Sequence, residues 1–549
     1  MPQNTVKDEK EKALAYLKEH TKRFKKGVEK VTENIYCAVG YGLANSTLIV
    51  TKKGNIIVDT TESIDSAAEI KAEFDKISPL PTIAIIYTHG HADHVNGASV
   101  FMDEQTEIYS NFKTVEFFHT QFNQLKSILD IRGARQFGVF LPPDHTPCSG
   151  LGPSLRVNRN NPKLVFPTQV FEDSLVLTIG EVTLQLVSAP GETDDQIFIW
   201  IPGQKVLLGA DNYYPAFPNL YTIRGTTPRP VLQWVQSLDK MRDLQAEYLV
   251  LGHTEPVFGS EQISELLTMY RDAIQFVHDS TVRGMNKGKS VEQLVEEISL
   301  PNHLRYCSEL RELYGSVSQS VRAIYHGYLG WFDGNATNLE RLSPKIFAGK
   351  IEQLAGGTDV LIEEAIRALG NEEYQWAAEL SDLLLALLPG SYYVKKIKIE
   401  ALTELGLRSY NSNNRSYYLS QANELKEYFH YPDKKPLKTR IAYAHAMPLD
   451  SFFANMTILL NPEHCKDKTY SVNVYIKDKV LDFRIVIRKG IAEIREGAEQ
   501  DPELTISTEE KIWKDIIIGA RECEEVIKRG ELQIEGDSTL CKEFIALFQ

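Results

Sequence analysis

The stretch "TIAIIYTHGHADHVNG" (residues 82–97) joins a short apolar run to a turn that is rich in histidine. The apolar run has the β-branched composition of a buried strand. The turn then places four metal-capable side chains within six positions, namely His89, His91, Asp93 and His94. Imidazole and carboxylate groups on a loop that leaves a strand can converge on two neighbouring cations, and imidazole nitrogens suit zinc. Because the chain holds only 13 histidines in 549 residues, chance explains this cluster poorly.

Three later segments repeat the plan of a strand followed by a turn that carries a metal-capable side chain. "LVSAPGETDD" places Glu192 after a strand, "KVLLGAD" ends at Asp211, and "EYLVLGH" ends at His253. A rigid sheet can aim side chains at the ends of its strands towards a common point. A lone carboxylate of this kind is more often structural, so the hypothesis of a binuclear metal site rests on the joint pattern.

The chain is too long for one hydrophobic core and shows three zones of composition. Residues 1–258 alternate short β-type runs with helices, and several runs are apolar on both faces, which predicts a layered α/β domain. Residues 259–440 carry helical periodicity with Gly and Pro stops, which predicts an all-α domain. Residues 446–549 alternate apolar and polar positions and then return to helices, which predicts a small α+β domain.

Bulk composition narrows the class of protein. A net charge of −14 disfavours binding to a phosphate backbone, so we expect no nucleic-acid partner. The longest apolar run, "LLLALL", is too short to span a bilayer, and the N-terminal twenty residues contain no signal-peptide core. The six cysteines are scattered without CxxC pairs and indicate reduced thiols. These features together predict a cytoplasmic enzyme without a transmembrane segment.

The order of these motifs resembles the metallo-β-lactamase superfamily: HxHxDH after a strand, a PG-x-T turn, a strand ending in Asp, and a GH pair. "APGETDD" has Glu192 where most of that superfamily has His, and with "ADNYYPAFPNLYTIRG" (residues 210–225) it is similar to the alkylsulfatase branch. The resemblance covers essentially the whole chain. It implies an αββα sandwich, a helical dimerisation domain and a C-terminal domain similar to sterol-carrier-like lipid-binding domains.

The resemblance also implies a ligand set for two zinc ions, with Asp93 and Asp211 as the catalytic carboxylates. Asp211 would bridge the two ions, at a position where the alkylsulfatases carry Glu. The remaining ligands divide between the two ions: His89, His91 and Glu192 for the first, and Asp93, His94 and His253 for the second. Two zinc ions that share a water produce hydroxide near neutral pH, which is suited to ester hydrolysis.

The substrate implied by the resemblance is an alkyl sulfate, whose anionic head requires a guanidinium and neutral donors. Asn219 and Arg224 match the sulfate-binding positions of the family, whereas the residues alone would favour an exposed ion pair for Arg224. Three expected substrate contacts depart from the family pattern. Gln319 stands where the family has His, and Trp331 and Phe137 stand where it has Tyr. Each change removes a proton donor or a polar contact near the expected sulfate.

The C-terminal zone admits two interpretations. Its alternating apolar residues could line a tunnel for an aliphatic chain, but a plain hydrophobic core explains them more simply. These residues are Val472, Val474, Ile476, Phe483, Ile485 and Ile487.

We therefore predict a homodimeric zinc-dependent hydrolase of primary or secondary alkyl sulfates. One alternative keeps the metal site and changes the substrate to another ester or lactone, because of Gln319 and Trp331. A second alternative is a non-catalytic carrier of alkyl chains or lipids. Release of inorganic sulfate from dodecyl sulfate and from 2-octyl sulfate separates the prediction from the first alternative, and loss of all hydrolase activity in His94→Ala would argue against the second.

Overall fold

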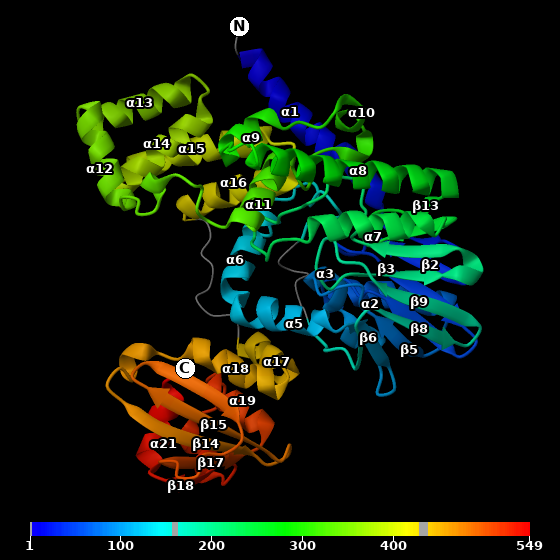
Figure 1. Cartoon of the computed structure of the whole chain (residues 1–549), viewed down its shortest axis with the longest axis vertical. Coiled ribbons are helices and arrows are strands. Elements are labelled where there is room, and N and C mark those ends of the chain that lie inside the picture. Colours follow the sequence, from blue (N-terminus) through cyan, green and yellow to red (C-terminus); the bar gives the residue numbers. More distant parts are fainter. Residues whose placement is uncertain (1–2, 156–162, 428–436) are drawn as a thin grey trace. The chain divides into compact units, whose positions relative to one another are not determined.

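The computed structural model describes residues 3–155, 163–427 and 437–549, and Figure 1 shows the arrangement of their helices and strands. The chain divides into two compact units. The larger unit contains most of the first 431 residues. The smaller unit contains residues 432–549 together with two short segments, 118–126 and 163–166. The metal-capable residues predicted from the sequence all belong to the larger unit.

The first sheet of the larger unit has seven strands in sequence order. Its first four strands pair antiparallel, and the last three follow in parallel. The strands are β1 (Gly27–Lys30), β2 (Ile35–Val39), β3 (Ser46–Thr51), β4 (Gly54–Val58), β5 (Thr82–Ile86), β6 (Glu107–Asn111) and β7 (Gln169–Phe171). Helix α2 (Ile64–Ile77) lies between β4 and β5 in the chain and begins at Ser63, whose side chain accepts a hydrogen bond from the Ser66 amide.

The second sheet has six strands in the order β13-β12-β11-β10-β9-β8. Strands β9, β11 and β12 run in the same direction, because β10 is antiparallel to both of its neighbours and β11 pairs parallel with β12. The carboxyl ends of these three strands therefore share one edge of the sheet. The strands are β8 (Ser174–Ile179), β9 (Val182–Ser188), β10 (Ile197–Ile201), β11 (Val206–Ala210), β12 (Tyr248–Leu251) and β13 (Val257–Phe258).

One hydrophobic core joins the two sheets. Ile49 and Ile56 of the first sheet belong to the same buried cluster as Leu186 and Ile199 of the second. Strands β4, β10 and β11 are buried along their whole length, as their continuous apolar runs predict. The layered α/β domain expected from the sequence is confirmed, followed by a helical region and an α+β unit.

The helices of the larger unit fall into two groups. Those before residue 258 flank the sheets, and those from 260 to 425 form the helical region, in which the structure describes no strand. The first group is α1 (Gln3–His20), α2, α3 (Ala92–Val95), α4 (Ala98–Phe101), α5 (Lys113–His119), α6 (Lys126–Gln136) and α7 (Val231–Asp243). The second group is α8 (Ser260–Met285), α9 (Val291–Glu297), α10 (Asn302–Arg305), α11 (Val317–Leu329), α12 (Pro344–Ala355), α13 (Thr358–Gly370), α14 (Tyr374–Leu387), α15 (Tyr392–Arg408) and α16 (Ser412–Leu425).

The first part of the helical region, α8 to α11, shares the buried core of the two sheets, whereas α13 to α16 pack around separate buried clusters. Leu313, Val321 and Ile324 belong to the same buried cluster as the two sheets. The amide of Phe217 donates a hydrogen bond to the Arg311 carbonyl, which ties the loop after β11 to the segment before α11. That loop also carries Asn219 and Arg224, so the helical region helps to position the predicted substrate contacts.

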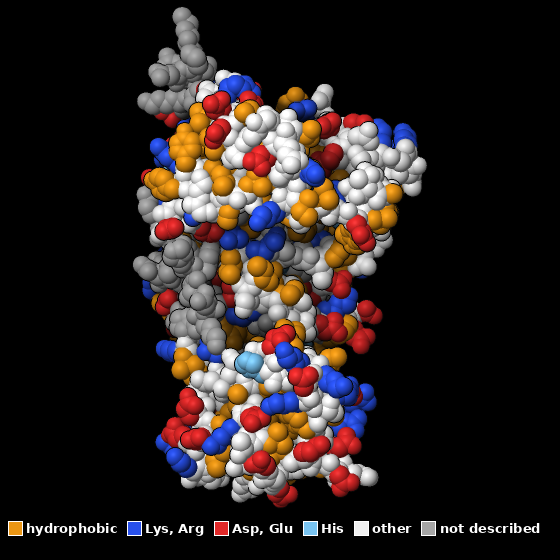
Figure 2. Space-filling model, turned by 90° about the vertical axis from the view of Figure 1, so that its left-hand side faces the viewer, with side chains coloured by type: hydrophobic (Ala, Val, Ile, Leu, Met, Phe, Trp, Pro, Cys, Tyr) orange, Lys and Arg blue, Asp and Glu red, His pale blue; other side chains and the backbone are white. Residues whose placement is uncertain are grey.

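Part of the helical region exposes large hydrophobic side chains. Orange side chains gather in the upper part of Figure 2, where α12 and α13 face the viewer. The exposed residues from the end of α11 to α13 include Leu329, Trp331, Leu339, Leu342, Ile346, Phe347, Leu354, Val360 and Ile366. An exposed apolar patch of this kind is typical of a protein–protein interface.

The smaller unit contains a five-stranded sheet in the order β16-β15-β14-β17-β18 and a layer of helices. Its strands are β14 (Thr469–Ile476), β15 (Leu481–Arg488), β16 (Ile491–Glu496), β17 (Leu504–Thr508) and β18 (Gln533–Gly536). Its helices are α17 (Leu437–Ala446), α18 (Leu449–Leu459), α19 (Glu510–Ile517), α20 (Cys523–Lys528) and α21 (Ser538–Ala546).

The six apolar residues considered for a tunnel are all buried in the core of this unit. They pack in one cluster with Phe453, Trp513 and Phe544, and Phe453 stacks on Phe483 with ring centroids 3.8 Å apart. These positions therefore form the hydrophobic core, which is the simpler of the two interpretations.

Among the described residues, no helix combines the length and the apolar character that a bilayer span requires.

Candidate metal centre and active site

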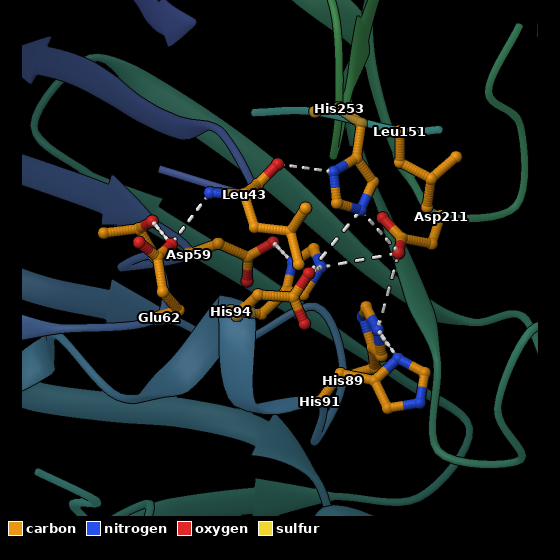
Figure 3. A network of polar contacts seen from close by, with 12 residues as sticks. Leu43, Asp59, Glu62, His89, His91, His94, Leu151, Asp211 and His253 are labelled. Atoms are coloured by element: carbon orange, nitrogen blue, oxygen red, sulfur yellow. Dashed lines mark hydrogen bonds and ion pairs between the residues drawn. The ribbon is translucent and has the colours of Figure 1, made fainter. Parts of the chain in front are cut away.

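The predicted metal ligands converge because the strand ends that carry them meet at one place. The turn after β5 supplies His89, His91, Asp93 and His94. The last two lie in the short helix α3. The second sheet contributes from the carboxyl ends of β9, β11 and β12, which share one edge. Figure 3 shows the histidines of the first turn facing the side chains from the second sheet.

The seven side chains form two adjoining groups. Within each group, one potential ligand atom per residue lies within 4.8 Å of the others. The first group is His89, His91, Glu192 and Asp211, and the second is Asp93, His94 and His253. Sequence spacing therefore identified residues that the fold does bring together, in the division that the family resemblance implies.

Asp211 lies between the two groups. Its Oδ2 atom is 3.1 Å from His253 Nε2 and 3.4 Å from His94 Nε2, both of the second group. The same oxygen is 3.8 Å from His89 Nε2 of the first group. An aspartate in this position can contribute a carboxylate oxygen to a cation on either side.

Two of the histidines are oriented by contacts on their far side. His94 Nδ1 lies 2.7 Å from Asp59 Oδ2, and His253 Nδ1 lies 2.8 Å from the Leu43 carbonyl (Figure 3). Asp59 also accepts hydrogen bonds from the amide and hydroxyl of Thr88, so it connects the end of β4 to the histidine turn. A proton held on Nδ1 by such partners leaves Nε2 with its lone pair towards the centre.

Close packing at the ends of β11 and β12 requires a residue without a side chain at Gly252 and a left-handed backbone at Ala210. A Cβ atom at Gly252 would lie 2.1 Å from Asp211 Oδ1, so a larger residue beside His253 would displace the central carboxylate. Ala210, directly before Asp211, has φ 48°, which is a left-handed conformation that non-glycine residues rarely adopt. Strain of this kind persists where the surrounding structure fixes the position of a functional side chain.

Arg229 is a site residue that sequence reasoning missed. Its Nη1 atom donates to Glu192 Oε1 at 2.8 Å and also to the Asn219 carbonyl. The side chains of Arg229 and Glu192 are both 2% exposed. A buried carboxylate requires such a partner, because an isolated charge in the protein interior is costly. Glu192 is thus held by one oxygen, while its other oxygen is available to the metal group.

The pKa values of the buried histidines divide along the two groups. Burial lowers the pKa of His89 and of His91, so both imidazoles are neutral. Burial also disfavours the charged form of His94 and of His253, but the neighbouring Asp211 carboxylate outweighs it and raises both pKa values, that of His253 to about 9. Burial also opposes ionisation of Asp211, but the adjacent His253 and His94 outweigh it and hold the pKa of Asp211 well below its usual value. The first group therefore presents two neutral imidazoles beside an ionised carboxylate, and a divalent cation at the second group would displace a proton from His94 and from His253.

The buried atoms without a hydrogen-bond partner at the centre of the site fit a cation. His94 Nε2, Glu192 Oε2 and Asp211 Oδ1 are buried and have no hydrogen-bond partner among the described residues. Buried polar atoms are almost always hydrogen-bonded in folded proteins, and these three atoms lie together among the metal-capable side chains, where a bound cation fits them. The two carboxylate oxygens are acceptors, and His94 Nε2 becomes a ligand once its proton is displaced, so a divalent metal satisfies all three atoms and an anion does not.

The predicted head-group residues lie on the loop beside this centre. Arg224 Nη2 is 3.0 Å from His91 Nε2, and Arg224 Nη1 donates to Thr222 Oγ1 at 2.8 Å. Asn219 is 1% exposed, and its Nδ2 has no hydrogen-bond partner among the described residues. A guanidinium and a free amide donor next to a cation centre can accept a small anionic group.

Gln136 is a second residue that sequence reasoning missed. Its Oε1 atom accepts hydrogen bonds from Thr222 Oγ1 at 2.9 Å and from the Arg224 amide at 2.8 Å. Gln136 is the last residue of α6 and is 1% exposed. It fixes the loop that carries Arg224.

The three residues that depart from the family pattern lie in three different environments. Phe137 follows Gln136 and packs half-buried against the main core. Gln319 is held at the first turn of α11, where Ser316 caps the helix, and its Nε2 donates to Asn414 Oδ1 at 2.7 Å. Trp331 is 72% exposed and contacts Phe332, so this fold does not bring it to the metal group.

Comparison with family models matches three parts of the chain. Residues 39–253 match the metallo-beta-lactamase superfamily, residues 290–428 match alkyl sulfatase dimerisation, and residues 439–549 match the alkyl sulfatase C-terminal family. The first match contains all seven metal-capable residues of the site. The fold and the site therefore define a protein of the metallo-β-lactamase superfamily.

Relatives that match along almost the whole length narrow the class. The chain is 34% identical over 518 residues to a linear primary-alkylsulfatase from Pseudomonas sp., covering 91% of this chain and 98% of the relative. It is 27% identical to an (R)-specific secondary-alkylsulfatase from Pseudomonas sp., covering 95% and 80%. The solved structure of the stereoselective inverting sec-alkylsulfatase Pisa1 from Pseudomonas sp. is 26% identical and matches with a TM-score of 0.89, covering 95% and 84%. The chain belongs to the alkylsulfatase family, as the resemblance of its motifs predicted.

Proposed function

We propose that this protein hydrolyses alkyl sulfate esters, primary or secondary, to an alcohol and inorganic sulfate. The observation that carries the proposal is the position of Arg224 and Asn219 beside seven convergent metal-capable side chains. Arg224 Nη2 lies 3.0 Å from His91 Nε2, and the buried Asn219 Nδ2 has no partner among the described residues. A sulfate ester has the anionic head that these donors require.

We infer two zinc ions at the centre, with the ligand sets given by the two groups. His89, His91 and Glu192 would hold one ion, and Asp93, His94 and His253 the other, with Asp211 shared between them. Bound there, the pair would lower the pKa of a shared water and neutralise charge on the ester oxygen. The donor set of four imidazoles and three carboxylates supports zinc over a harder cation such as magnesium.

The chain's own residues would orient the ester. The Arg224 guanidinium and Asn219 Nδ2 would bind the sulfate oxygens, and Gln136 would keep Arg224 in place through its backbone amide. Asp93 is the most exposed of the seven proposed ligands, with a side chain 18% exposed. Asp211 would keep the histidines of both groups at fixed distances from a common carboxylate.

Release of inorganic sulfate from dodecyl sulfate and from 2-octyl sulfate tests the proposal. We expect zinc-loaded protein to release sulfate from at least one of them, and His94→Ala to abolish the release. An intact zinc content with no release from either substrate would contradict it and favour another ester or lactone. Tight binding of alkyl chains with no hydrolase activity of any kind would favour the carrier alternative.

We also propose that the protein is a homodimer whose domains are residues 1–258, 259–440 and 446–549. The match of residues 290–428 to alkyl sulfatase dimerisation and the exposed apolar patch on α12 and α13 support this proposal. A light-scattering mass near that of one 62.2 kDa chain at micromolar concentration would count against it.

A further inference from the structure

The turn that supplies Glu192 also contains a buried carboxyl group that belongs to neither proposed ligand set. This group is Asp195, which is 1% exposed and lies two positions before β10. Its neighbour Asp194 is exposed and pairs with Lys113, with Oδ2 and Nζ 2.7 Å apart. Burying a carboxyl group is costly unless hydrogen bonds compensate it, so the inward position of Asp195 indicates a specific role.

Asp195 holds the backbone between two proposed zinc ligands. Its Oδ2 atom accepts a hydrogen bond from the amide of Gly90 at 2.7 Å, and Gly90 stands between His89 and His91 in the chain. The same oxygen accepts a hydrogen bond from the hydroxyl of Thr114 at 2.8 Å. Thr114 lies on α5 and is completely buried. The carboxyl group of Asp195 therefore joins α5 to the histidine turn.

Two further contacts fix the same turn. The amide of Ile197, at the start of β10, donates to the Thr88 carbonyl at 2.9 Å. A Cβ atom at Gly90 would lie 2.6 Å from a ring carbon of Phe117, so a larger residue would displace that ring. The Phe117 ring packs edge to face against the His91 ring, with centroids 5.5 Å apart. The turn is thus held by the second sheet and by α5 together.

We propose that Asp195 is a positioning residue for one of the two zinc ions, the ion that His89, His91 and Glu192 would hold. The inference rests on the two-zinc centre of the proposed function. One turn of the chain, residues 192–195, then supplies one ligand of this ion and also the anchor for its other two ligands. The neighbouring Asp194 has no part in this arrangement.

The two ions should respond differently to the loss of Asp195. The far-side contacts of the second group are supplied by other residues, namely Asp59 to His94 and the Leu43 carbonyl to His253. Asp195→Ala should therefore weaken binding of the first ion alone, by about 10- to 100-fold, which is the usual effect of removing a group that orients metal ligands. Asp195→Asn should lie between Ala and wild type, because its amide oxygen can still accept the hydrogen bond from Gly90.

Two single-ion backgrounds of the full-length chain test this difference. His253→Ala leaves the first group complete, and His89→Ala leaves the second group complete. Zinc affinity is measured in each background by competition with a chromophoric chelator, with and without Asp195→Ala. We expect a loss of about 10- to 100-fold in the His253→Ala background and of less than about threefold in the His89→Ala background.

Asp194→Ala is the matched control and should change neither affinity, because its side chain is exposed and pairs with Lys113. Equal losses in the two backgrounds would overturn the inference, since a merely structural role would disturb every ligand on the histidine turn. No loss in either background would also overturn it. If Asp195→Ala does not fold, Asp195→Asn takes its place, and the same two outcomes decide.

Zinc content and sulfate release of the wild type are measured on the same preparations. Two bound zinc ions and the expected difference between the backgrounds, without sulfate release, would support the role of Asp195 while contradicting the proposed activity. Sulfate release by a two-zinc wild type with equal losses in the backgrounds would do the reverse. A wild type that binds no zinc would contradict both.

Discussion

Arg229 Nη1 lies 2.8 Å from Glu192 Oε1, and both side chains are almost completely buried. The same nitrogen donates to the carbonyl of Asn219. One guanidinium therefore connects a proposed zinc ligand to the loop that carries the proposed sulfate contacts. Glutamate replaces histidine at this ligand position of the superfamily, and the buried arginine supplies the positive charge that the substitution requires.

Arg229→Met should weaken metal binding about 10- to 100-fold, because the ligating carboxylate loses the group that orients it. Arg229→Lys should lie between Met and wild type, since lysine keeps the charge but not the planar donor geometry. The measurement is a zinc competition titration with a chromophoric chelator. Arg415→Met is the control, because that buried arginine donates to backbone carbonyls such as that of Leu407. Equal zinc affinity in Arg229→Met and wild type would show that Arg229 does not contribute to metal binding.

Arg224→Ala should raise KM for alkyl sulfates and lower kcat/KM about 10- to 150-fold. This range corresponds to about 1.5–3 kcal/mol for a hydrogen bond to a charged group. Zinc content should stay unchanged, because Arg224 is not among the proposed ligands. Steady-state sulfate release and metal analysis of the same preparation check both parts. An Arg224→Ala variant with wild-type KM would place the sulfate elsewhere.

Gln136→Met should lower kcat/KM about tenfold, because it removes the acceptor that holds Thr222 and the Arg224 amide. Methionine has a similar volume, so packing at the end of α6 should be retained. The double variant with Arg224→Ala should be no worse than Arg224→Ala alone, since Gln136 acts through Arg224. Additive losses in this cycle would indicate a separate role.

The convergence of the proposed ligands could be predicted from the sequence because each ligand lies in the turn after a strand. The pattern of an apolar run, a turn and a His, Asp or Glu is local, and the parallel directions of β9, β11 and β12 bring the strand ends together. Arg229 and Gln136 have no such local signal. Their partners are 37 and 88 positions away in the chain, and only the folded loop shows the contacts.

Composition also could not show how the zones pack. Helices α8 to α11 share the buried core of the two sheets, whereas α13 to α16 form separate buried clusters, although the periodicity of both parts is that of amphipathic helices. Residues 118–126 and 163–166 group with the C-terminal unit, although they lie within the first zone of the sequence. Trp331 is 72% exposed, because it follows the end of α11, where the helix leaves the core.

Stability should fall between pH 7 and pH 5 partly through His20. Burial lowers the pKa of His20 to about 4, and its Nε2 lies 2.8 Å from the Gly150 carbonyl. The folded state thus keeps His20 neutral, whereas the unfolded chain takes up a proton near pH 6.5. The contribution of His20 to the free energy of unfolding is fully present above pH 6.5 and is lost as the pH falls towards 4. About 2 kcal/mol of it is lost from pH 7 to pH 5.

Urea unfolding of wild type and His20→Gln at the two pH values measures this contribution. The glutamine retains a donor for Gly150 but does not titrate. We expect the variant to lose about 2 kcal/mol less than the wild type on acidification. The same pH dependence in both proteins would show that His20 is not responsible.

The most direct measurement of the central claim is zinc content and sulfate release on the same sample, before and after removal of metal by a chelator. We expect about two zinc ions per chain, loss of sulfate release from dodecyl and 2-octyl sulfate on chelation, and recovery when zinc is restored. Sulfate release that continues at full rate in metal-free protein would contradict it.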